Sequence, residues 1–290
     1  MSAEPLSLHA GRAALPGSTH AANTGELSRF AAINWSPHTL ADNHVWCAEE
    51  FWVSSRAKGR RYAFRMLRYW FMEHLLTTER ARLGRPLKVL EIGVDRGQTK
   101  AYIDGALRNA SGEADALYTS WDAADVSPQT QALAVAGYAN CLRLNLDDAD
   151  SLAQFVGARH AQYDVVILLH VLEHLRQPER ATTFVSAAVR TGGIMIGGFP
   201  VLPSGVARWR ERQLRSSAQP FGHISAFSPR RVRKMAERAG LALEYASGAF
   251  AVRASGSWLE NHAWWMRLNV AFGALFHGWP GEIYWQYRKR

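Results

Sequence analysis

The segment from Tyr163 to Glu179 carries side chains whose types and spacing could do chemistry. Its sequence, YDVVILLHVLEHLRQPE, runs from an apolar stretch into His170, Glu173 and His174. An imidazole titrates near neutral pH, so a histidine here could move a proton in a reaction. The same letters satisfy H-x-x-E-H, a pattern in which two histidines on one helix hold zinc and the glutamate activates water. Proton transfer and zinc hydrolysis therefore compete as interpretations.

The position of His170 favours the first interpretation. A zinc site of this kind needs His170 and His174 on one helix, with a third ligand from elsewhere in the chain. His170 instead follows directly on a run of Val, Ile and Leu that begins at Val165. Such a run is typical of a buried parallel strand, so His170 is expected at a strand end. We therefore expect neither a zinc hydrolase nor a metal ligand set in this segment.

A second segment, KVLEIGVDRGQTK from Lys88 to Lys100, indicates a strand, a tight turn and the start of a helix. Gly93 and Gly97 would let the backbone approach a ligand closely, and a helix start offers free amides. Asp95 stands at the middle position of a G-x-G-x-x-G pattern, so the dinucleotide fingerprint is poorly matched. The loop nevertheless predicts a ligand site.

Acidic residues follow the next two predicted strands. YTSWDAADVSP places Asp125 at a strand end, where its carboxylate can accept both hydroxyls of a ribose, with Asp122 as the alternative. In NLDDADSL, Asp147 or Asp148 comes just past the third strand and could receive an adenine amino group. Together with the glycine loop, these acids predict a ligand that contains adenosine.

These side chains need a frame that brings several strand ends together. From Leu87 the chain alternates short apolar runs with helical stretches, which is typical of βαβ units. We expect a Rossmann-like α/β fold with a seven-stranded, mostly parallel sheet and helices on both faces. The expected strands are 87–92, 116–124, 139–145, 163–169, 193–199, 241–252 and a last one from residue 281.

Turn chemistry marks the ends of two helices. Ser127 and Ser228 each precede a proline and are predicted as N-caps, while Gly137 and Gly240 are predicted as helix stops. An amphipathic helix is expected over 58–80. We divide the chain into a loosely packed arm (1–45), a helical extension (46–84) and a main domain (85–290).

Composition narrows the class of protein. The 290 residues are 48% apolar, and no run approaches the ~18 apolar residues of a membrane span. Neither Cys47 nor Cys141 lies in a CxxC pair, and the first residues lack a basic stretch before an apolar one, so a cytoplasmic protein is expected. The net charge of +9 is concentrated at 56–68, 230–234 and 288–290, which we interpret as solvated helix faces.

Four motifs in order resemble the class I S-adenosylmethionine-dependent methyltransferases. They are VLEIG-x(3)-G, DVSP, DVVI-x(2)-HVLEH and the glycine-containing strand TGGIMIGGFP. The resemblance continues through GHISAFSPRRVRKMAERAGL, which is similar to the family's late loop and helix, and covers about residues 85–250. It is closest to the branch with HVLEH that acts on sugars and small molecules.

The resemblance implies S-adenosylmethionine as cofactor and assigns residues to it. The assigned residues are Glu91, Gly93 and Gly97 in the methionine-side loop, Asp125 and Val126 at the ribose, Asp147 or Asp148 at the adenine, and His170 beside the sulfonium. Asp95 departs from the pattern, because many relatives carry Gly there. Its side chain either points outward or meets the amino group of the ligand.

Methyl transfer is a single in-line displacement, so few catalytic groups are required. An aliphatic hydroxyl acceptor would benefit from a general base. The candidates are His170, His174 and His223, with His223 on the acceptor side and His170 on the cofactor side.

The aromatic segment 257–279 is expected to cover the acceptor. It carries Trp258, Trp264, Trp265, Phe272, Phe276 and Trp279. Such rings suit sugar faces and aromatic acceptors, or a peripheral contact at the inner face of a membrane.

Similar family members that end in a GEIY-like strand imply O-methylation of a sugar, glycolipid or secondary metabolite of bacterial envelopes, hence a small-molecule or glycan acceptor. The alternatives are a phenolic or quinone-like acceptor, or an inactive scaffold. A nucleic acid partner is not expected, because HVLEH replaces the N/D-PPY motif.

Overall fold

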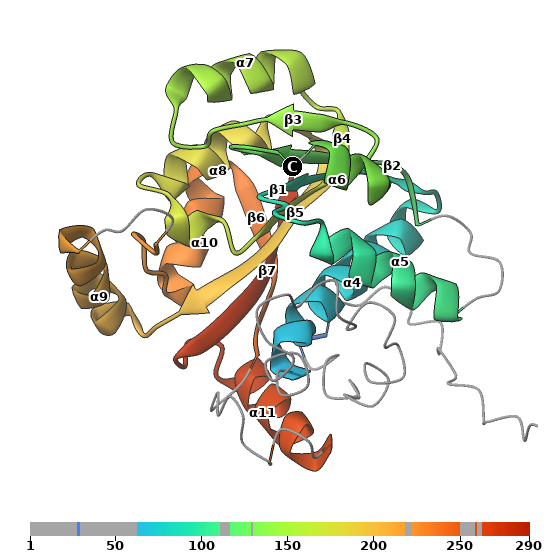
Figure 1. Ribbon diagram of the computed structural model, residues 1–290. Helices are drawn as coiled ribbons and strands as arrows, with labels where there is room; N and C mark the ends of the chain where they lie inside the picture. The colour runs from blue at the N-terminus through green and yellow to red at the C-terminus, as the bar shows by residue number, and fades with distance from the viewer. Residues whose placement is uncertain are drawn as a thin grey trace, which may run out of the picture.

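The computed structural model describes residues 28–29, 63–110, 117–128, 130–217, 222–249, 259 and 263–290 (Figure 1). The strands are β1 (Leu87–Ile92), β2 (Tyr118–Asp125), β3 (Cys141–Arg143), β4 (Tyr163–Leu169), β5 (Val189–Val201), β6 (Leu241–Gly248) and β7 (Gly281–Lys289). The helices in the described ranges are α4 (Ala63–Leu83), α5 (Gln98–Ala110), α6 (Thr130–Val135), α7 (Ala149–Arg159), the short 3₁₀ helix η2 (Leu172–His174), α8 (Pro178–Ser186), α9 (Ser204–Ser216), α10 (Pro229–Arg238) and α11 (Ala263–Leu275).

All seven strands join one sheet in the order β3-β2-β1-β4-β5-β7-β6. β7 runs antiparallel to its neighbours β5 and β6, and the other pairs are parallel. The predicted Rossmann-like, mostly parallel sheet is therefore confirmed. In the sheet, β2 and β3 lie on one side of β1, and β4 lies on its other side, so the strand order reverses between β1 and β4. In open α/β sheets such a reversal creates a crevice at the carboxyl ends of the two strands, where ligands bind.

The predicted strand positions hold, with shifts at the ends. The expected strands 87–92 and 163–169 match β1 and β4 residue for residue. β3 is shorter than expected because it is an edge strand that pairs only with β2. β5 is longer than expected because β4 and β7 pair with it on both sides.

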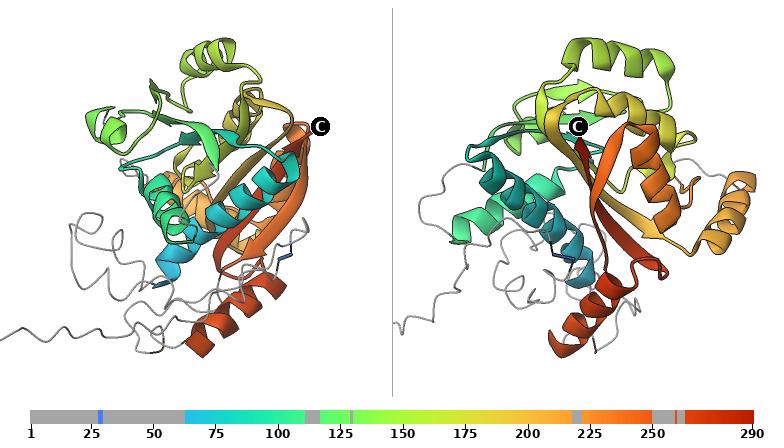
Figure 2. Two further views of the ribbon diagram at one scale, coloured as in Figure 1. Left: turned by 90° about the vertical axis from the view of Figure 1, so that its right-hand side faces the viewer. Right: turned by 180° about the vertical axis from the view of Figure 1, so that it is seen from behind.

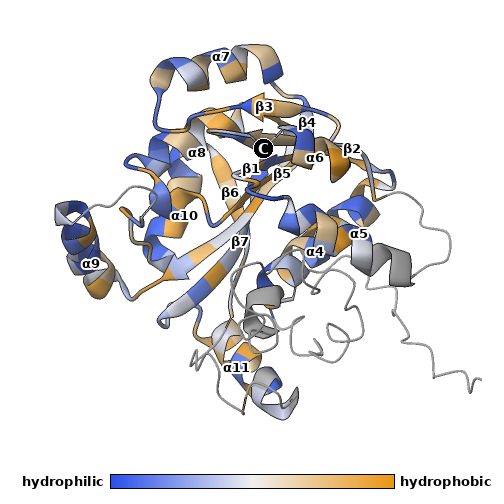
Figure 3. Cartoon of the chain, viewed as in Figure 1, coloured by the Kyte–Doolittle hydropathy of each residue, from blue (hydrophilic) through white to orange (hydrophobic). Residues whose placement is uncertain are grey.

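Helices cover both faces of the sheet, and each face has its own core (Figure 2). On one face, side chains of α4, α5 and α11 pack with Val89, Val165 and Ile196. On the other, α7, α8 and α10 pack against Leu90, Leu168 and other strand residues. Figure 3 shows the corresponding pattern, with hydrophobic residues along the strands and hydrophilic residues on the outer sides of the helices. A sheet buried on both faces requires such apolar strands.

Three of the four predicted helix ends are confirmed and one is wrong. The Ser228 side chain accepts the amide of Arg231 and caps α10, with a proline at the first helical position. Gly137 and Gly240 have positive φ (79° and 68°), as helix stops require. Ser127 is no N-cap, because α6 begins at Thr130. The Ser127 amide instead donates to the Asp125 carboxylate at 3.3 Å, which holds it in the turn after β2.

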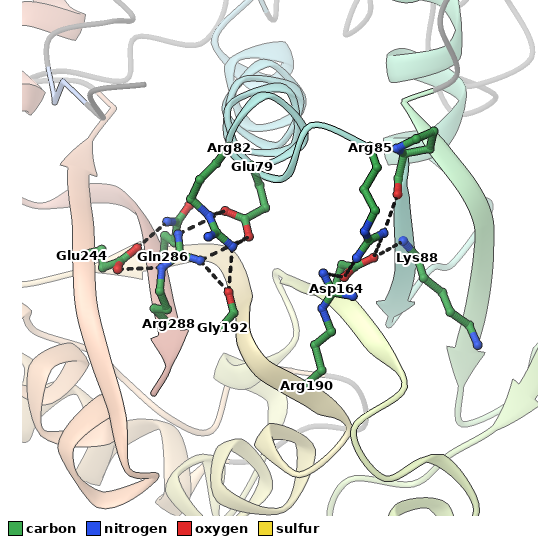
Figure 4. Close-up of polar contacts among 11 residues, drawn as sticks. Glu79, Arg82, Arg85, Lys88, Asp164, Arg190, Gly192, Glu244, Gln286 and Arg288 are labelled. Carbon is green, nitrogen blue, oxygen red and sulfur yellow. Dashed lines mark hydrogen bonds and ion pairs between the residues drawn. The ribbon is translucent and has the colours of Figure 1, made fainter. Parts of the chain in front are cut away.

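An ion network fastens α4 to the edge of the sheet where β4 and β5 begin (Figure 4). Glu79 of α4 is buried and accepts hydrogen bonds from Arg82 and from Arg288 of β7. Arg288 also pairs with Glu244 of β6 at 2.6 Å and donates to the carbonyl of Gly192. Three strands and a helix are thereby joined at the edge opposite to the strand ends that form the crevice.

Asp164 is the centre of a second, separate group of ion pairs and hydrogen bonds at the same edge (Figure 4). Its buried carboxylate accepts the amide of Lys88 at 2.8 Å and two hydrogen bonds from Arg85, and it also pairs with Arg190. Burial alone would raise the pKa of Asp164, but these donors outweigh burial and hold the pKa below its ordinary value. The carboxylate therefore ties β1, β4 and β5 together while ionised.

Most of the segment before α4 lies outside the described residues. The arm expected over 1–45 is described only at residues 28–29, and the helix expected over 58–80 is seen as α4 from Ala63. Among the described helices, none combines the length and the apolar content that crossing a bilayer requires.

We predict that Asp164→Asn lowers the free energy of unfolding at pH 7 by about 2 kcal/mol, because hydrogen bonds to an ionised group are lost. Since the folded pKa is depressed, the contribution of Asp164 is present above the unfolded pKa of about 3.9 and is lost as pH falls below it. Urea unfolding at pH 7 and pH 3 measures this. The difference between variant and parent should shrink at pH 3. Glu237→Gln, at an exposed site, should match the parent at both pH values.

Candidate active site

The loop between β1 and α5 adopts the left-handed backbone conformation at three positions. Gly93 and Gly97 have φ of 75°, and Asp95 has φ of 48°. The Gly93 amide donates to the carbonyl of Ala124 in β2 at 2.8 Å, so the loop begins as an extension of the sheet. Gly93 and Asp95 are exposed at the carboxyl edge. Backbone groups of the loop are thus open to a ligand at the point where the sheet reverses.

Both glycines are required by close approach to other parts of the protein. A Cβ at Gly93 would lie 2.4 Å from the Val171 side chain, directly after β4. A Cβ at Gly97 would lie 2.9 Å from the ring of Tyr138. The loop is therefore pressed against the HVLEH segment on one side and Tyr138 on the other.

Asp95 occupies a position that favours glycine, and its residue type explains why this is tolerated. Aspartate visits the left-handed region more readily than most residues. Its side chain is exposed, and its amide points at the Asp125 carboxylate at 3.4 Å. This exposure fits both sequence interpretations, the outward orientation and a contact with the amino group of the ligand.

Asp125 ends β2 beside the glycine loop. Among the described residues, its two oxygens accept only long hydrogen bonds, from the amides of Asp95 at 3.4 Å and Ser127 at 3.3 Å. A carboxylate has about four acceptor positions, so capacity remains for the hydroxyls of a ribose. The adjacent Val126 is half exposed, as a residue that contacts a ligand must be. The alternative, Asp122, is buried within the strand and bound by Tyr163 and Asn140, which leaves it away from the edge.

Glu91 lies below the loop rather than on it. Its carboxyl is buried and accepts the Tyr138 hydroxyl at 2.7 Å. Burial raises the pKa of Glu91, while hydrogen bonds from Thr99, Tyr138 and Trp121 oppose the rise. The structure thus shows Glu91 as an anchor for the residues under the glycine loop.

Asp147 and Asp148 follow β3 at the same edge but have different partners. Asp148 caps α7 by accepting the Asp150 amide. Asp147 is exposed and accepts the amide of Arg176 at 3.0 Å, which joins the loop after β3 to the loop after η2. Each of the two carboxylates thus accepts one backbone amide, and Asp147 is the one whose partner follows the HVLEH segment.

His170 follows β4 directly, as the sequence predicts, and it has φ of 56°. Its amide donates to the Gly198 carbonyl at 2.8 Å, so the unusual backbone is held by β5. Nδ1 lies 2.9 Å from a Glu173 oxygen, and Nε2 lies 3.5 Å from Glu282 of β7. Burial and Arg68 lower the pKa of His170, but Glu282 and Glu173 raise it more, so the net pKa is above the ordinary value.

The group that holds His170 in place was missed by the sequence interpretation. Glu282 is buried, pairs with Arg68 of α4 at 2.8 Å and accepts the Tyr284 hydroxyl at 2.6 Å. Burial alone would raise the pKa of Glu282, but Arg68 and His170 outweigh it and the pKa is strongly lowered. The signal lay in the predicted last strand, where Glu282 directly precedes the apolar and aromatic residues 283–285.

Glu173, His174 and His223 come together at the same edge. One potential ligand atom from each lies within 4.8 Å of those of the other two. The rings of His174 and His223 meet edge to face with centroids 4.9 Å apart. His223 is exposed, yet desolvation by the surrounding protein still lowers its pKa.

The H-x-x-E-H zinc arrangement is not formed by this segment. His170 lies outside η2, and its ring is directed to Glu173 and Glu282 instead. His174 is the last residue of η2. The third residue of the cluster with Glu173 and His174 is instead His223, which lies in the loop before α10.

The loop that carries His223 is fastened to η2 by backbone hydrogen bonds. The amides of Ile224 and Ser225 both donate to the Glu173 carbonyl, at 2.8 and 3.0 Å. The Ser225 hydroxyl donates to the carbonyl of Leu175 at 2.8 Å. The position of His223 beside His174 is therefore set by the fold. The carboxyl edge of the sheet thus combines the exposed glycine loop, the Asp125 carboxylate, which can accept hydrogen bonds, and a group of histidines.

Comparison with known proteins agrees with this arrangement. The model of the methyltransferase domain family matches residues 61–246. Among curated proteins no sequence matches the chain.

Solved structures share the fold at low identity. CalH in complex with SAH is 16% identical over 88% of this chain and 66% of that chain, with a TM-score of 0.50. The CurJ carbon methyltransferase is 15% identical over 91% and 61%, with a TM-score of 0.51, and the cyclase SpnF is 14% identical over 81% and 83%, with a TM-score of 0.50. The chain spans less than two thirds of the first two structures.

The family match extends from the segment before α4 into β6, so it includes the glycine loop, Asp125 and the HVLEH segment. Each of these elements lies at the carboxyl edge, where a class I methyltransferase binds its cofactor. The chain belongs to the methyltransferase domain family, and the cofactor of this domain is S-adenosylmethionine.

Proposed function

We propose that the protein methylates a hydroxyl of a sugar, glycolipid or secondary metabolite. The observation that carries this proposal is the group of histidines beside the cofactor crevice. His170 is partly buried next to the glycine loop, and His174 and His223 extend the group toward solvent. An aliphatic hydroxyl loses its proton with difficulty, so a histidine-rich side of the crevice has a use that a more acidic acceptor would not require.

The residues of the crevice divide the work of binding. The bound cofactor supplies an electrophilic methyl group. Asp125 would hold the ribose, the backbone at Gly93 and Asp95 would receive the amino acid part, and Asp147 lies on the adenine side. The strained, doubly held His170 would then lie on the methyl side, because it is separated from Gly93 only by Val171.

Aromatic side chains at the end of α11 support an acceptor with a sugar or ring face. Phe272 packs against Phe276 and Trp279, with centroids 4.8 and 5.5 Å away. These residues come just before Glu282, the partner of His170. α11 is seated on β6 by two glycines, since a Cβ at Gly248 would lie 2.5 Å from the Gly273 carbonyl. Trp258, expected in the same cover, lies outside the described residues.

The same helix presents large apolar side chains to solvent. Trp264, Leu268 and Leu275 of α11, and Phe276 directly after it, are each more than half exposed. This exposure supports a peripheral contact with a membrane surface, where a glycolipid acceptor would be met.

The choice of acceptor is tested by methyl transfer from labelled S-adenosylmethionine to a panel of glycosides, nucleotide sugars, phenols and amines. We expect labelled methyl ethers of aliphatic hydroxyls. Transfer to phenols alone would support the alternative acceptor class, and transfer to carbon or nitrogen alone would contradict O-methylation. A folded protein with no transfer to any member would favour the scaffold alternative.

We predict that Asp125→Asn weakens binding of S-adenosylhomocysteine by about 10-fold or more, because charge-assisted hydrogen bonds of roughly 1.5–3 kcal/mol are lost. Calorimetric titration measures this. The matched control is Asp150→Asn, an exposed carboxylate at the start of α7, which should bind like the parent. Equal binding by the Asp125 variant and the parent would remove Asp125 from the ribose site.

We also predict that the double variant Trp264→Ser, Leu268→Ser reduces sedimentation with vesicles of anionic phospholipid. The reason is the loss of two exposed apolar side chains that would enter the headgroup region. The control is Val135→Ser. Val135 is an exposed apolar residue of α6, which lies beside β3 at the other end of the strand order from β6. If the parent protein does not sediment with the vesicles, the membrane contact is wrong.

A further inference from the structure

Glu173 has a charged side chain whose hydrogen-bonding capacity is only half used. The side chain is almost completely buried, at 1% exposure. One oxygen, Oε1, is engaged by His170 Nδ1 at 2.9 Å. The other, Oε2, is buried and has no hydrogen-bond partner among the described residues. Burying an unpaired carboxylate oxygen is costly, so a missing partner is expected there.

Two imidazoles lie near the Glu173 carboxylate. His174 and His223 each bring a potential ligand atom within 4.8 Å of one another and of a Glu173 oxygen. The spacing suits three ligands around a single ion, since first-row metals bind nitrogen and oxygen at about 2 Å.

The tautomer of His174 agrees with metal binding. Its Nδ1 lies 3.2 Å from the carbonyl of Gly222, which can only accept a hydrogen bond. Nδ1 therefore carries the proton, and Nε2 of the neutral ring keeps its lone pair. Histidines that bind metals usually donate their other ring N–H to a carbonyl or carboxylate in this way.

We propose that Glu173, His174 and His223 bind a divalent first-row transition-metal ion such as Zn²⁺ or Co²⁺. Two imidazoles and a carboxylate suit these ions better than Mg²⁺ or Ca²⁺, which prefer oxygen ligands alone. Three protein ligands leave further coordination positions open, which is typical of catalytic rather than structural sites. The fastening of the His223 loop to the Glu173 carbonyl keeps the three ligands near each other before the ion binds.

The metal site itself does not depend on the proposed function. Only the role of the ion in the reaction rests on that function. The cluster is linked through His170 to the methyl side of the crevice. A divalent ion lowers the pKa of a bound hydroxyl, so a hydroxyl acceptor that binds there would release its proton to water near neutral pH. Its oxygen would then take the methyl group while the sulfonium leaves as a neutral thioether. His223 then serves as a ligand on the acceptor side.

The test uses full-length protein that carries no histidine tag and has been treated with chelator. Titration with Co²⁺ should produce visible absorption bands that saturate at a single ion per chain, and Zn²⁺ should abolish them by displacement. His223→Ala, at an exposed position, should weaken Co²⁺ binding by about 10-fold or more, because loss of an outer-shell partner alone can cost that much. Glu173→Gln should do the same while it keeps the shape that His170 contacts.

The matched control is His160→Ala, at an exposed histidine at the end of α7, which should bind Co²⁺ like the parent. Co²⁺ binding that neither cluster variant weakens would overturn the proposal, as would a folded parent protein that binds no Co²⁺. Binding of S-adenosylhomocysteine is measured in parallel. If the ion binds and no hydroxyl is methylated, the metal site stands and the proposed acceptor fails, so the two outcomes are distinguishable.

Discussion

The buried carboxylate of Glu282 is the constraint on which the active edge depends. An ionised group in the protein interior needs opposite charge and hydrogen bonds, and Glu282 finds them in Arg68, Tyr284 and His170. These partners come from α4, β7 and the end of β4, so satisfying one carboxylate fixes three elements relative to each other. Phe71 of α4 stacks on the Tyr284 ring at 4.2 Å and adds apolar packing to the same junction. His170 is thereby held in a backbone conformation that it would not otherwise favour.

Close backbone approach completes the arrangement. Because Gly93 has no Cβ, the Val171 side chain can pack directly against the glycine loop. Gly197 and Gly198 have the same role deeper in the sheet, where any Cβ would meet the Leu168 carbonyl or the Tyr284 ring. The amino edge is stabilised separately by Glu79 and Asp164, so the cofactor edge is free of the fold's main ion network.

Much of the fold could be predicted from the sequence because burial on both faces gives parallel strands a continuous apolar signal. β1 and β4 were predicted at their observed bounds for this reason, and His170 was predicted at a strand end. Strand ends set by pairing were less predictable, as in β3 and β5. Ser127 was mistaken for a helix cap because the local pattern does not show that Asp125 captures its amide.

The site was only partly predictable. Asp125 and the glycine loop follow local patterns, and the structure brings them together. The partnership of Arg68 with Glu282, and that of His223 with Glu173 and His174, depends on contacts between distant parts of the chain, which a local pattern does not reveal. Glu91 was expected on the loop but lies beneath it. Its hydrogen-bond partner Tyr138 lies between α6 and β3, far from Glu91 in the sequence.

The most direct test of the account is a crystal structure of the full chain with S-adenosylhomocysteine. The account predicts the ligand across the ends of β1, β2 and β4, with both ribose hydroxyls on Asp125, the adenine on the Asp147 side and the sulfur toward His170. A ligand bound elsewhere, or bound in this crevice with its ribose away from Asp125, would contradict it.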